Sequence, residues 1–471
     1  MKNKIFQSRD LCLRALDINS ACAKSVRRNE DKNDHSYFVT CFIFGRIVFC
    51  NLELQGKEHP PKGKMLYRYG MLLLLTCLVL TDVLKGTLRY GMLLFLLFVQ
   101  GTILLLQTLR RAGKEEADAA DQRKVRVPRQ VLHLLGTMIL FGIALIPAIF
   151  FPQYQPLKPT GEYEVCSVVE TWEDQSRIET YSDTGENRKV TIKIWYPKEN
   201  GTYPLAVFSH GAGGMLESNA STCEELASHG YVAVSIAHPY QAAFVEDTSG
   251  KVTLADQEFM SQVMTDNGSD TEEHEQKIYQ LQKEWMEIRT GDENFVLDTL
   301  LQKAAEGEGE PYDRIDAEKI GLFGHSLGGA TSVAVGRQRK DISAVIDIEG
   351  TMLAEYTGYE NGKHSFQQEP YPVPLLDINS RKVYELAKGY PQEYVNFYVG
   401  EHAVEFREVV FEDAGHMNFC DLSMVSPILA KILGTGKVNA RKCLENLNEI
   451  VLNYFDYYLK GKQGITIADT Y

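Results

Sequence analysis

The side chains best suited to chemistry lie around Ser326, in a Gly-x-Ser-x-Gly pentapeptide that runs from Gly324 to Gly328. An apolar run, 320–323, precedes the pentapeptide and small residues follow it. This order predicts a strand, a sharp turn and a helix, which would raise the Ser326 hydroxyl above a sheet as a nucleophile. Glycines must flank the serine because side chains there would collide with the strand and the helix. Among 37 glycines in 471 residues the pentapeptide alone is a weak indication, and its context strengthens it.

A serine nucleophile needs a base, and the base needs a carboxylate to orient it. His416 is the candidate base because it follows the last predicted strand, 407–411. In the expected chain order the carboxylate comes between the serine and the histidine. Asp347, near the end of a predicted strand, is the favoured candidate; Asp377 is its competitor and Glu349 is third.

The third requirement is a pair of donors for the oxyanion of the tetrahedral intermediate. The main-chain N–H of Leu327 is free if a helix begins directly after the nucleophile. The second donor should lie in the glycine-rich stretch 210–214, where the backbone can approach a substrate closely. We expect Ala212 to supply it. Nine scattered cysteines show no metal-ligand spacing, so we expect neither a metal site nor a cofactor.

Strand-like and helix-like segments alternate from about residue 161, which predicts a mostly parallel sheet covered by helices on both faces. The expected fold class is α/β, with a closing helix over 444–459. Residues 239–288 interrupt the alternation as an acidic insertion with a predicted helix at 272–286, placed where a lid would lie. The expected strands are 190–196, 204–209, 231–237, 319–323, 344–348, 373–378 and 407–411, with a helix at 217–228.

The N-terminal third differs in composition from the rest. Residues 1–64 form a poorly defined leader, and translation could start at Met65. Residues 65–152 contain three apolar segments of roughly the length that crosses a bilayer, so we expect a membrane anchor of about three transmembrane helices. A proline-rich spacer, 153–160, leads to the globular domain, 161–471. The three segments are Tyr69–Leu84, Tyr90–Leu109 and Val131–Phe151.

Charge sets the expected orientation and excludes one class of partner. The loop 110–130 is rich in lysine and arginine, so the positive-inside rule places it in the cytoplasm and the globular domain on the extracytoplasmic side of the cell membrane. The net charge of −14, without a basic stripe, argues against a nucleic-acid partner. Cysteines at 166, 223, 420 and 443 could pair on that side, although spacing does not show it.

Four segments together resemble the plasma-type platelet-activating factor acetylhydrolases, over roughly residues 160–460. They are 207–213, 227–232, 324–331 and 345–347. The resemblance implies an α/β-hydrolase fold and cleavage of short or oxidised sn-2 acyl chains from phospholipids, without calcium. It implies Ser326, His416 and Asp347 as the catalytic triad, with the amides of Ala212 and Leu327 as the oxyanion hole. The membrane spans and the insertion depart from the family pattern.

These patterns lead to the expectation of a membrane-anchored serine esterase, similar to a 1-alkyl-2-acetylglycerophosphocholine esterase, that acts on a phospholipid or another small ester. One alternative is a non-lipid carboxylesterase or acetylesterase, or an enzyme similar to dienelactone hydrolases. Another is a catalytically idle binding module on a membrane anchor, against which the complete set of triad residues counts. A transporter is a weaker alternative because the apolar segments lack charged pairs.

Overall fold

The computed structural model describes residues 127–265, 272–361, 363–390 and 394–471, together with scattered residues between 70 and 106. The chain forms two compact units, Met1–Tyr154 and Gln155–Tyr471. The boundary falls at the start of the predicted spacer, 153–160. The spacer residues have neither helix nor strand, as their prolines favour.

The first unit contains helix α5 (Val127–Phe150), which covers most of the third predicted span and includes Pro147. Several of its side chains are exposed, among them Ile139 and Ile143. Within the part of the chain that the structure describes, no helix combines the length and the apolar character that a membrane crossing requires. The predicted leader, 1–64, and most of the two earlier spans lie outside the described residues.

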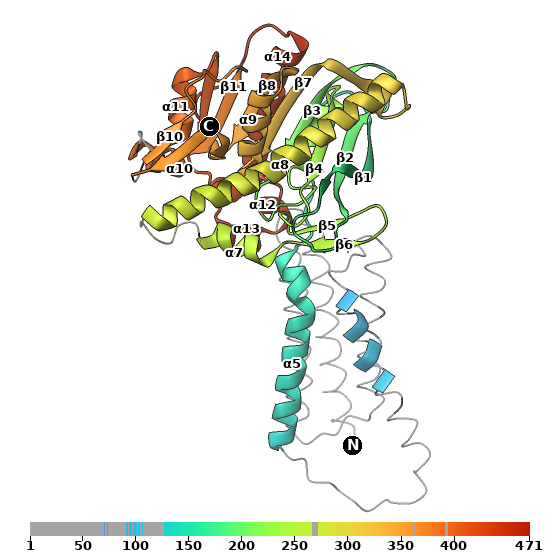
Figure 1. The fold of residues 1–471 in the computed structure, drawn as a ribbon. Helices are drawn as coiled ribbons and strands as arrows, with labels where there is room; N and C mark the ends of the chain where they lie inside the picture. The colour runs from blue at the N-terminus through green and yellow to red at the C-terminus, as the bar shows by residue number, and fades with distance from the viewer. Residues whose placement is uncertain are drawn as a thin grey trace, which may run out of the picture. The chain divides into compact units, whose positions relative to one another are not determined.

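The second unit is built on an eight-stranded sheet in the order β1-β2-β4-β3-β7-β8-β11-β12 (Figure 1). Strands β4 to β12 in this order run parallel, and β1 and β2 add an antiparallel edge. The strands are β1 (Val165–Ile178), β2 (Asn187–Pro197), β3 (Tyr203–Ser209), β4 (Val232–Ala237), β7 (Ile315–His325), β8 (Ile342–Ile348), β11 (Leu375–Ser380) and β12 (Phe406–Phe411).

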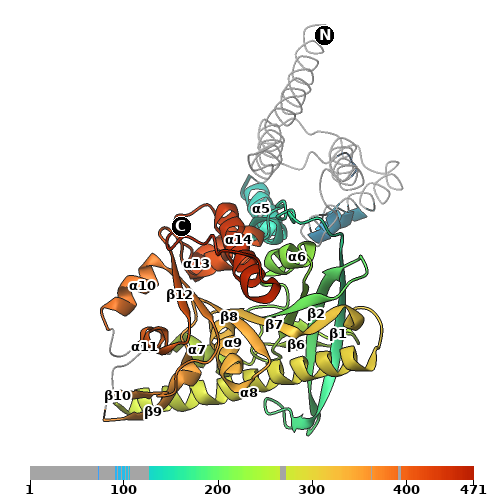
Figure 2. The same cartoon turned by 90° about the horizontal axis from the view of Figure 1, so that it is seen from above.

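Helices cover both faces of the sheet (Figure 2). One face packs against α6 (Ala220–Ser228) and α14 (Ala440–Lys460), whose Phe455 meets Phe323 of β7. The other face packs against α8 (Glu272–Glu306) and α9 (Leu327–Gln338). Both faces of the central strands are therefore buried, which explains why β3 and β4 are continuous apolar runs rather than alternating ones.

The predicted parallel core is confirmed, and the insertion is more ordered than its composition indicates. It forms the hairpin of β5 (Phe244–Glu246) and β6 (Val252–Leu254), then α7 (Gln257–Thr265) and the first part of α8. The predicted helix at 272–286 continues without a break into α8. Strand β1 was not predicted, because most of its side chains are polar and only partly buried at the edge of the sheet, so the sequence lacks the apolar pattern of a buried strand.

Shorter elements complete the carboxyl-terminal half. They are β9 (Tyr356–Glu360), β10 (Lys363–Phe366), α10 (Arg381–Lys388), α11 (Val395–His402), α12 (Leu422–Val425) and α13 (Pro427–Leu433). The cysteines at 166, 223, 420 and 443 are free thiols. Because parallel strands end at a common edge, the residues that follow β3, β4, β7, β8, β11 and β12 meet there.

Candidate active site

Ser326 occupies the turn between β7 and α9, with φ 57° and ψ −126°. This left-handed conformation is rare for a residue with a side chain and is typical of strained functional sites. The N–H of Ser326 donates to the carbonyl oxygen of Ile348 at 2.8 Å, which fixes the turn against β8. A side chain at Gly324 or Gly328 would collide with backbone atoms, so the tight turn needs both glycines. The predicted strand, turn and helix are therefore present.

The glycine-rich loop after β3 passes directly beside the nucleophile. A Cβ added at Gly211 would lie 3.0 Å from the Cβ of Ser326. The N–H of Gly213 donates to the Gln241 carbonyl at 2.8 Å, and the N–H of Gly214 donates to the Gly211 carbonyl at 3.0 Å. Among the bonds that the structure describes, none uses the main-chain N–H of Ala212 or of Leu327. Both predicted oxyanion donors therefore remain available.

His416 begins the short 3-10 helix His416–Phe419 after β12, and its side chain is 37% exposed. Its ring lies 4.5 Å, centroid to centroid, from the ring of His325, the residue before the nucleophile. His325 Nε2 also lies 3.1 Å from the main-chain oxygen of His416, so the two loops are in contact. Burial lowers the pKa of His325 well below its usual range, so this histidine is neutral and donates to that oxygen.

The carboxylate that contacts the His416 ring in the structure is Glu349, whereas the sequence analysis favoured Asp347 for this place. Glu349 Oε2 lies 2.6 Å from Nδ1 of His416. Its Oε1 accepts from the N–H of Ser380 at 2.7 Å, so the carboxylate is held at both oxygens. Glu349 follows the last residue of β8 and has φ 52°, which turns its side chain toward the carboxyl edge of the sheet.

Asp347 lies within β8, and its side chain points toward α9 instead of His416. Its Oδ1 accepts from the N–H of Gly350 at 3.0 Å, and a side chain at Gly329 would collide with it. Burial, together with the nearby Asp377, raises the pKa of Asp347 well above its usual range. The position of the Asp347 side chain, which lies against α9 and away from the His416 ring, therefore argues against Asp347 as the carboxylate that orients this ring.

Asp377, the competing candidate, is also buried and away from His416. It lies opposite Asp347 in the parallel register of β11 and β8. Its Oδ2 accepts from Asn396 Nδ2 at 3.4 Å. Burial raises the pKa of Asp377 to about 7. The two aspartates therefore form a buried acid pair beneath the turn that carries Glu349.

The structure thus brings Ser326, His416 and Glu349 to one edge of the sheet. Within the part of the chain that the structure describes, no hydrogen bond joins the Ser326 hydroxyl to the His416 ring. In serine hydrolases this bond often tightens only when the substrate is bound. The arrangement can activate a hydroxyl, hold a protonated imidazole and accept an oxyanion on two amides, which is the chemistry of acyl transfer.

The insertion packs on both oxyanion residues. Phe259 of α7 and Trp285 of α8 form a buried cluster with Leu327, and Ala212 packs against that cluster. A side chain at Gly213 would lie 2.9 Å from the terminal methyl of Met260. The insertion predicted as a lid therefore packs against both of these residues through buried apolar side chains.

Reasoning from the sequence ranked Glu349 third and missed a buried polar network behind the glycine-rich loop. The signal for Glu349 was its place directly after a strand end and directly before Gly350, where a turn at the sheet edge is expected. The network includes Arg289 and Asp292 of α8, and charged residues that are spaced three apart inside a helix carry no signal that they are buried.

Comparison with known proteins gives the same fold and names a family. The model of the family "Platelet-activating factor acetylhydrolase, isoform II" matches residues 183–468. A platelet-activating factor acetylhydrolase of Gallus gallus is 23% identical over 305 residues, which are 58% of this chain and 66% of that protein. The Cavia porcellus protein of the same name is 25% identical over 58% of this chain and 61% of its own length. The matches thus span less than two thirds of these relatives.

More distant similarities follow the same fold. Cutinase est1 of Thermobifida alba is 26% identical over 155 residues, which are 33% of this chain and 38% of that protein. A ferulic acid esterase structure from Streptomyces cinnamoneus superposes with a TM-score of 0.50 and 22% identity, and covers 66% of this chain and 94% of that one. The order of strands and the strained serine turn agree with this α/β-hydrolase architecture. With more than half of its length matched by the family model, the chain belongs to the isoform II family of platelet-activating factor acetylhydrolases.

Proposed function

We propose that this protein is a serine hydrolase that cleaves carboxylic esters through an acyl-enzyme on Ser326. His416 is the general base, and Glu349 holds it in the tautomer that can take the serine proton. The main-chain amides of Ala212 and Leu327 receive the oxyanion. The observation that carries the proposal is the 2.6 Å contact between His416 and Glu349 at the same sheet edge as the strained Ser326.

The substrate class follows from family membership and from the apolar surroundings of the site. We propose short or oxidised sn-2 acyl chains of phospholipids, since the relatives named above are platelet-activating factor acetylhydrolases. The cluster of Phe259, Trp285 and Leu327 beside the oxyanion amides suits an acyl chain better than a sugar ring. A non-lipid acetylesterase is the competing outcome.

We further propose that the N-terminal apolar segments anchor the protein in a membrane, with the catalytic domain on the extracytoplasmic side. The support is the sequence: the apolar runs between residues 69 and 151 and the basic loop 110–130. A membrane-impermeant fluorophosphonate applied to intact cells should label the protein. Labelling only after the cells are opened would place the domain on the cytoplasmic side.

The direct test of the chemistry is labelling and hydrolysis by the full-length chain in detergent micelles. We expect a fluorophosphonate probe to attach to Ser326 and to block hydrolysis of a phospholipid with an sn-2 acetyl group. Rates should fall as the sn-2 chain lengthens from acetyl to palmitoyl. Faster release of acetate from an acetylated glycan than from the phospholipid would support the acetylesterase instead. A chain that is neither labelled nor active on any ester would contradict the proposed function.

A further inference from the structure

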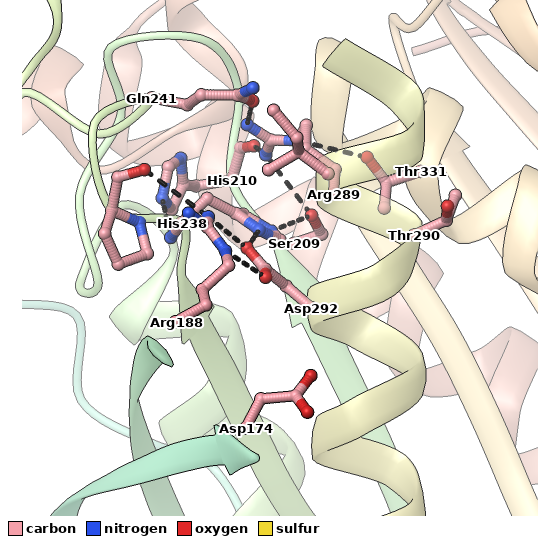
Figure 3. A network of polar contacts seen from close by, with 12 residues as sticks. Asp174, Arg188, Ser209, His210, His238, Gln241, Arg289, Thr290, Asp292 and Thr331 are labelled. Carbon is pink, nitrogen blue, oxygen red and sulfur yellow. Dashed lines mark hydrogen bonds and ion pairs between the residues drawn. The ribbon is translucent and has the colours of Figure 1, made fainter. Parts of the chain in front are cut away.

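Helix α8 carries a buried arginine, Arg289, behind the glycine-rich loop 210–214, which we call the oxyanion loop. The residue is 0% exposed. Its guanidinium donates hydrogen bonds to four oxygens and to no carboxylate among the ion pairs that the structure describes (Figure 3). The four acceptors are the main-chain oxygen of His210, Ser209 Oγ at 3.3 Å, Gln241 Oε1 at 3.3 Å and Thr331 Oγ1 at 3.1 Å.

These acceptors come from the three segments that surround the oxyanion site. Ser209 ends β3 and His210 follows it, Gln241 follows β4, and Thr331 lies in the first turns of α9. These segments are also bonded to the residues proposed as oxyanion donors or to their neighbours. Thr331 Oγ1 donates to the Leu327 carbonyl at 2.7 Å. The Gln241 carbonyl accepts from the N–H of Gly213, which is next to Ala212. The Arg289 guanidinium therefore connects the segments that carry the main-chain N–H groups of Ala212 and Leu327.

The side chain of His210 extends this support to the peptide that carries the Ala212 N–H. His210 Nδ1 lies 2.7 Å from the Gly211 carbonyl oxygen. Burial and the charge of Arg289 lower the pKa of His210 well below its usual range, so the ring is neutral and Nδ1 is the protonated nitrogen. The carbonyl of Gly211 belongs to the same peptide unit as the N–H of Ala212. Fixing that carbonyl fixes the direction of the N–H.

Behind Arg289 lies a second relay of serine, histidine and aspartate. Ser209 Oγ lies 2.8 Å from His238 Nε2, and His238 Nδ1 lies 3.0 Å from Asp292 Oδ2. Arg188 closes the network with two bonds to Asp292, at 2.6 and 2.7 Å. Ser209, His238 and Asp292 are all 0% exposed, so no substrate can reach this serine.

The charges of this network are fixed by burial and pairing. Burial and the charge of Arg289 lower the pKa of His238 to about 3, so this histidine is neutral. Burial alone would raise the pKa of Asp292, but the Arg188 guanidinium holds it well below its usual range. His238 therefore donates from Nδ1 to Asp292 and accepts the Ser209 proton at Nε2. This leaves the lone pairs of Ser209 Oγ for Arg289.

We propose that Arg289 is the positioning residue of the oxyanion hole, which holds the Ala212 peptide and the start of α9 at the spacing that the tetrahedral intermediate needs. This inference rests on the proposed function of the site. Arg289 does not contact substrate, because it is fully buried. Arg289 acts by holding the amides of Ala212 and Leu327 in place before substrate binds. Donors that are preorganised in this way usually make the largest single contribution to stabilising the transition state of acyl transfer.

The test compares Arg289→Met and Arg289→Lys with the matched control Arg314→Met, all in the full-length chain. Arg314 is also a buried arginine that donates to main-chain carbonyls, including that of Lys198 at 3.2 Å, but it lies at the start of β7, away from the catalytic edge. Hydrolysis of p-nitrophenyl acetate and inhibition by an aryl trifluoromethyl ketone, which mimics the tetrahedral intermediate, are measured at a temperature where each variant is folded.

We expect Arg289→Met to lower kcat/KM by about 10- to 100-fold, which is less than the roughly 10²–10³-fold cost of deleting an oxyanion donor. The inhibition constant of the ketone should rise by a similar factor, while KM changes by less than about threefold. Arg289→Lys keeps the charge but lacks the several N–H donors of the guanidinium, so its loss of kcat/KM should lie between those of the wild type and of Arg289→Met. Arg314→Met should lower the unfolding temperature and change kcat/KM by less than about threefold.

The inference would be overturned by an Arg289→Met enzyme with kcat/KM within about threefold of the wild type, or by a loss that Arg314→Met reproduces. A fall in kcat/KM without weaker ketone binding would also contradict it, because a merely structural role predicts that pattern. If Arg289→Met does not fold, Thr331→Val removes one acceptor and its bond to Leu327, and should cost about fivefold on both measures. An inactive and unlabelled wild-type chain would instead remove the proposed function itself.

Discussion

The molecule contains two relays of serine, histidine and carboxylate, and they differ in almost everything except their composition. The first, Ser326 with His416 and Glu349, lies at the carboxyl edge of the sheet, where His416 is 37% exposed. The second, Ser209 with His238 and Asp292, is 0% exposed at all three residues. Ser209 is the last residue of a regular strand, whereas Ser326 sits in a strained turn.

The difference shows that a triad becomes catalytic through its surroundings rather than through its hydrogen bonds. The edge relay has the amides of Ala212 and Leu327 near the serine and a histidine that is 37% exposed. The buried relay has Arg289 and Arg188 as its neighbours, and its bonds hold the backbone in place. A serine, a histidine and a carboxylate therefore suit the proposed chemistry at the edge, whereas a similar set supports a loop in the interior.

The largest expected effect separates the two serines. Ser326→Ala should lower kcat for ester hydrolysis by about 10⁴–10⁶-fold and abolish fluorophosphonate labelling, because the nucleophile is lost. Ser209→Ala should still be labelled at Ser326, with a loss in kcat of no more than about tenfold. Mass spectrometry of the labelled peptide distinguishes the sites. A probe attached to Ser209 would show that the buried relay is accessible, which would contradict the distinction between the two relays.

The next effect tests which carboxylate serves the edge relay. Glu349→Gln should lower kcat by about 10³–10⁴-fold, because an amide that donates to His416 Nδ1 imposes the wrong tautomer. Asp347→Asn should keep kcat within about tenfold, because the Asp347 side chain lies against α9 and makes no contact with His416 among the bonds that the structure describes. Steady-state kinetics of the two variants decides between them. The reverse ranking would restore Asp347 as the orienting acid.

The third prediction concerns what the buried relay contributes. Asp292→Asn removes one of the two anionic partners of the buried Arg188, the other being Glu179, so the free energy of unfolding should fall by about 3–5 kcal/mol. Glu349→Gln, in the edge relay, keeps a side-chain oxygen for the Ser380 N–H, so it should lower the free energy of unfolding by only about 1–2 kcal/mol. Urea unfolding of the full-length chain in detergent, followed by tryptophan fluorescence, measures both. Equal losses of unfolding free energy would contradict the view that the buried relay serves stability and the edge relay serves the reaction rate.

The smallest expected effect is a pH dependence that arises from the acid pair beneath the edge relay. Burial raises the pKa of Asp377 to about 7, and that of Asp347 is raised as well. This pair therefore binds more protons in the folded state than in the unfolded state between about pH 4 and pH 7. The contribution of the pair to stability should be fully present below this range and should fall by about 1–3 kcal/mol as the pH rises to 8. Asp377→Asn should flatten the profile between pH 5 and 8; a profile as steep as that of the wild type would contradict this origin.

Much of the site could be predicted from the sequence because its signals are local. The strained turn around Ser326 needs glycines at fixed offsets, and a parallel sheet places His416 after its last strand. The buried strands are continuous apolar runs, so the order of elements is visible in the chain. The amides of Ala212 and Leu327 could be predicted as oxyanion donors because glycines and a helix start mark them, and their role stays a prediction.

The choice between Asp347 and Glu349 was decided only by the tertiary structure. The two residues lie two positions apart, and the outcome depends on where β8 ends and on the left-handed backbone of Glu349. That backbone is fixed by contacts with β11, such as the bond from the Glu349 N–H to the Ile378 carbonyl at 2.7 Å. Contacts between distant segments leave no pattern in a single sequence.

The buried relay likewise depends on the tertiary structure, because Ser209, His238 and Asp292 come from β3, the loop after β4 and α8. Nothing local distinguishes Arg289 or Asp292 from charged residues on the surface of a helix. The sequence by itself determined the reaction type that we propose, since an elbow serine, a base and two amides have local requirements. Only the tertiary structure showed that Glu349 contacts His416 and that Arg289 lies behind the glycine-rich loop, because both depend on the register of distant strands and on burial.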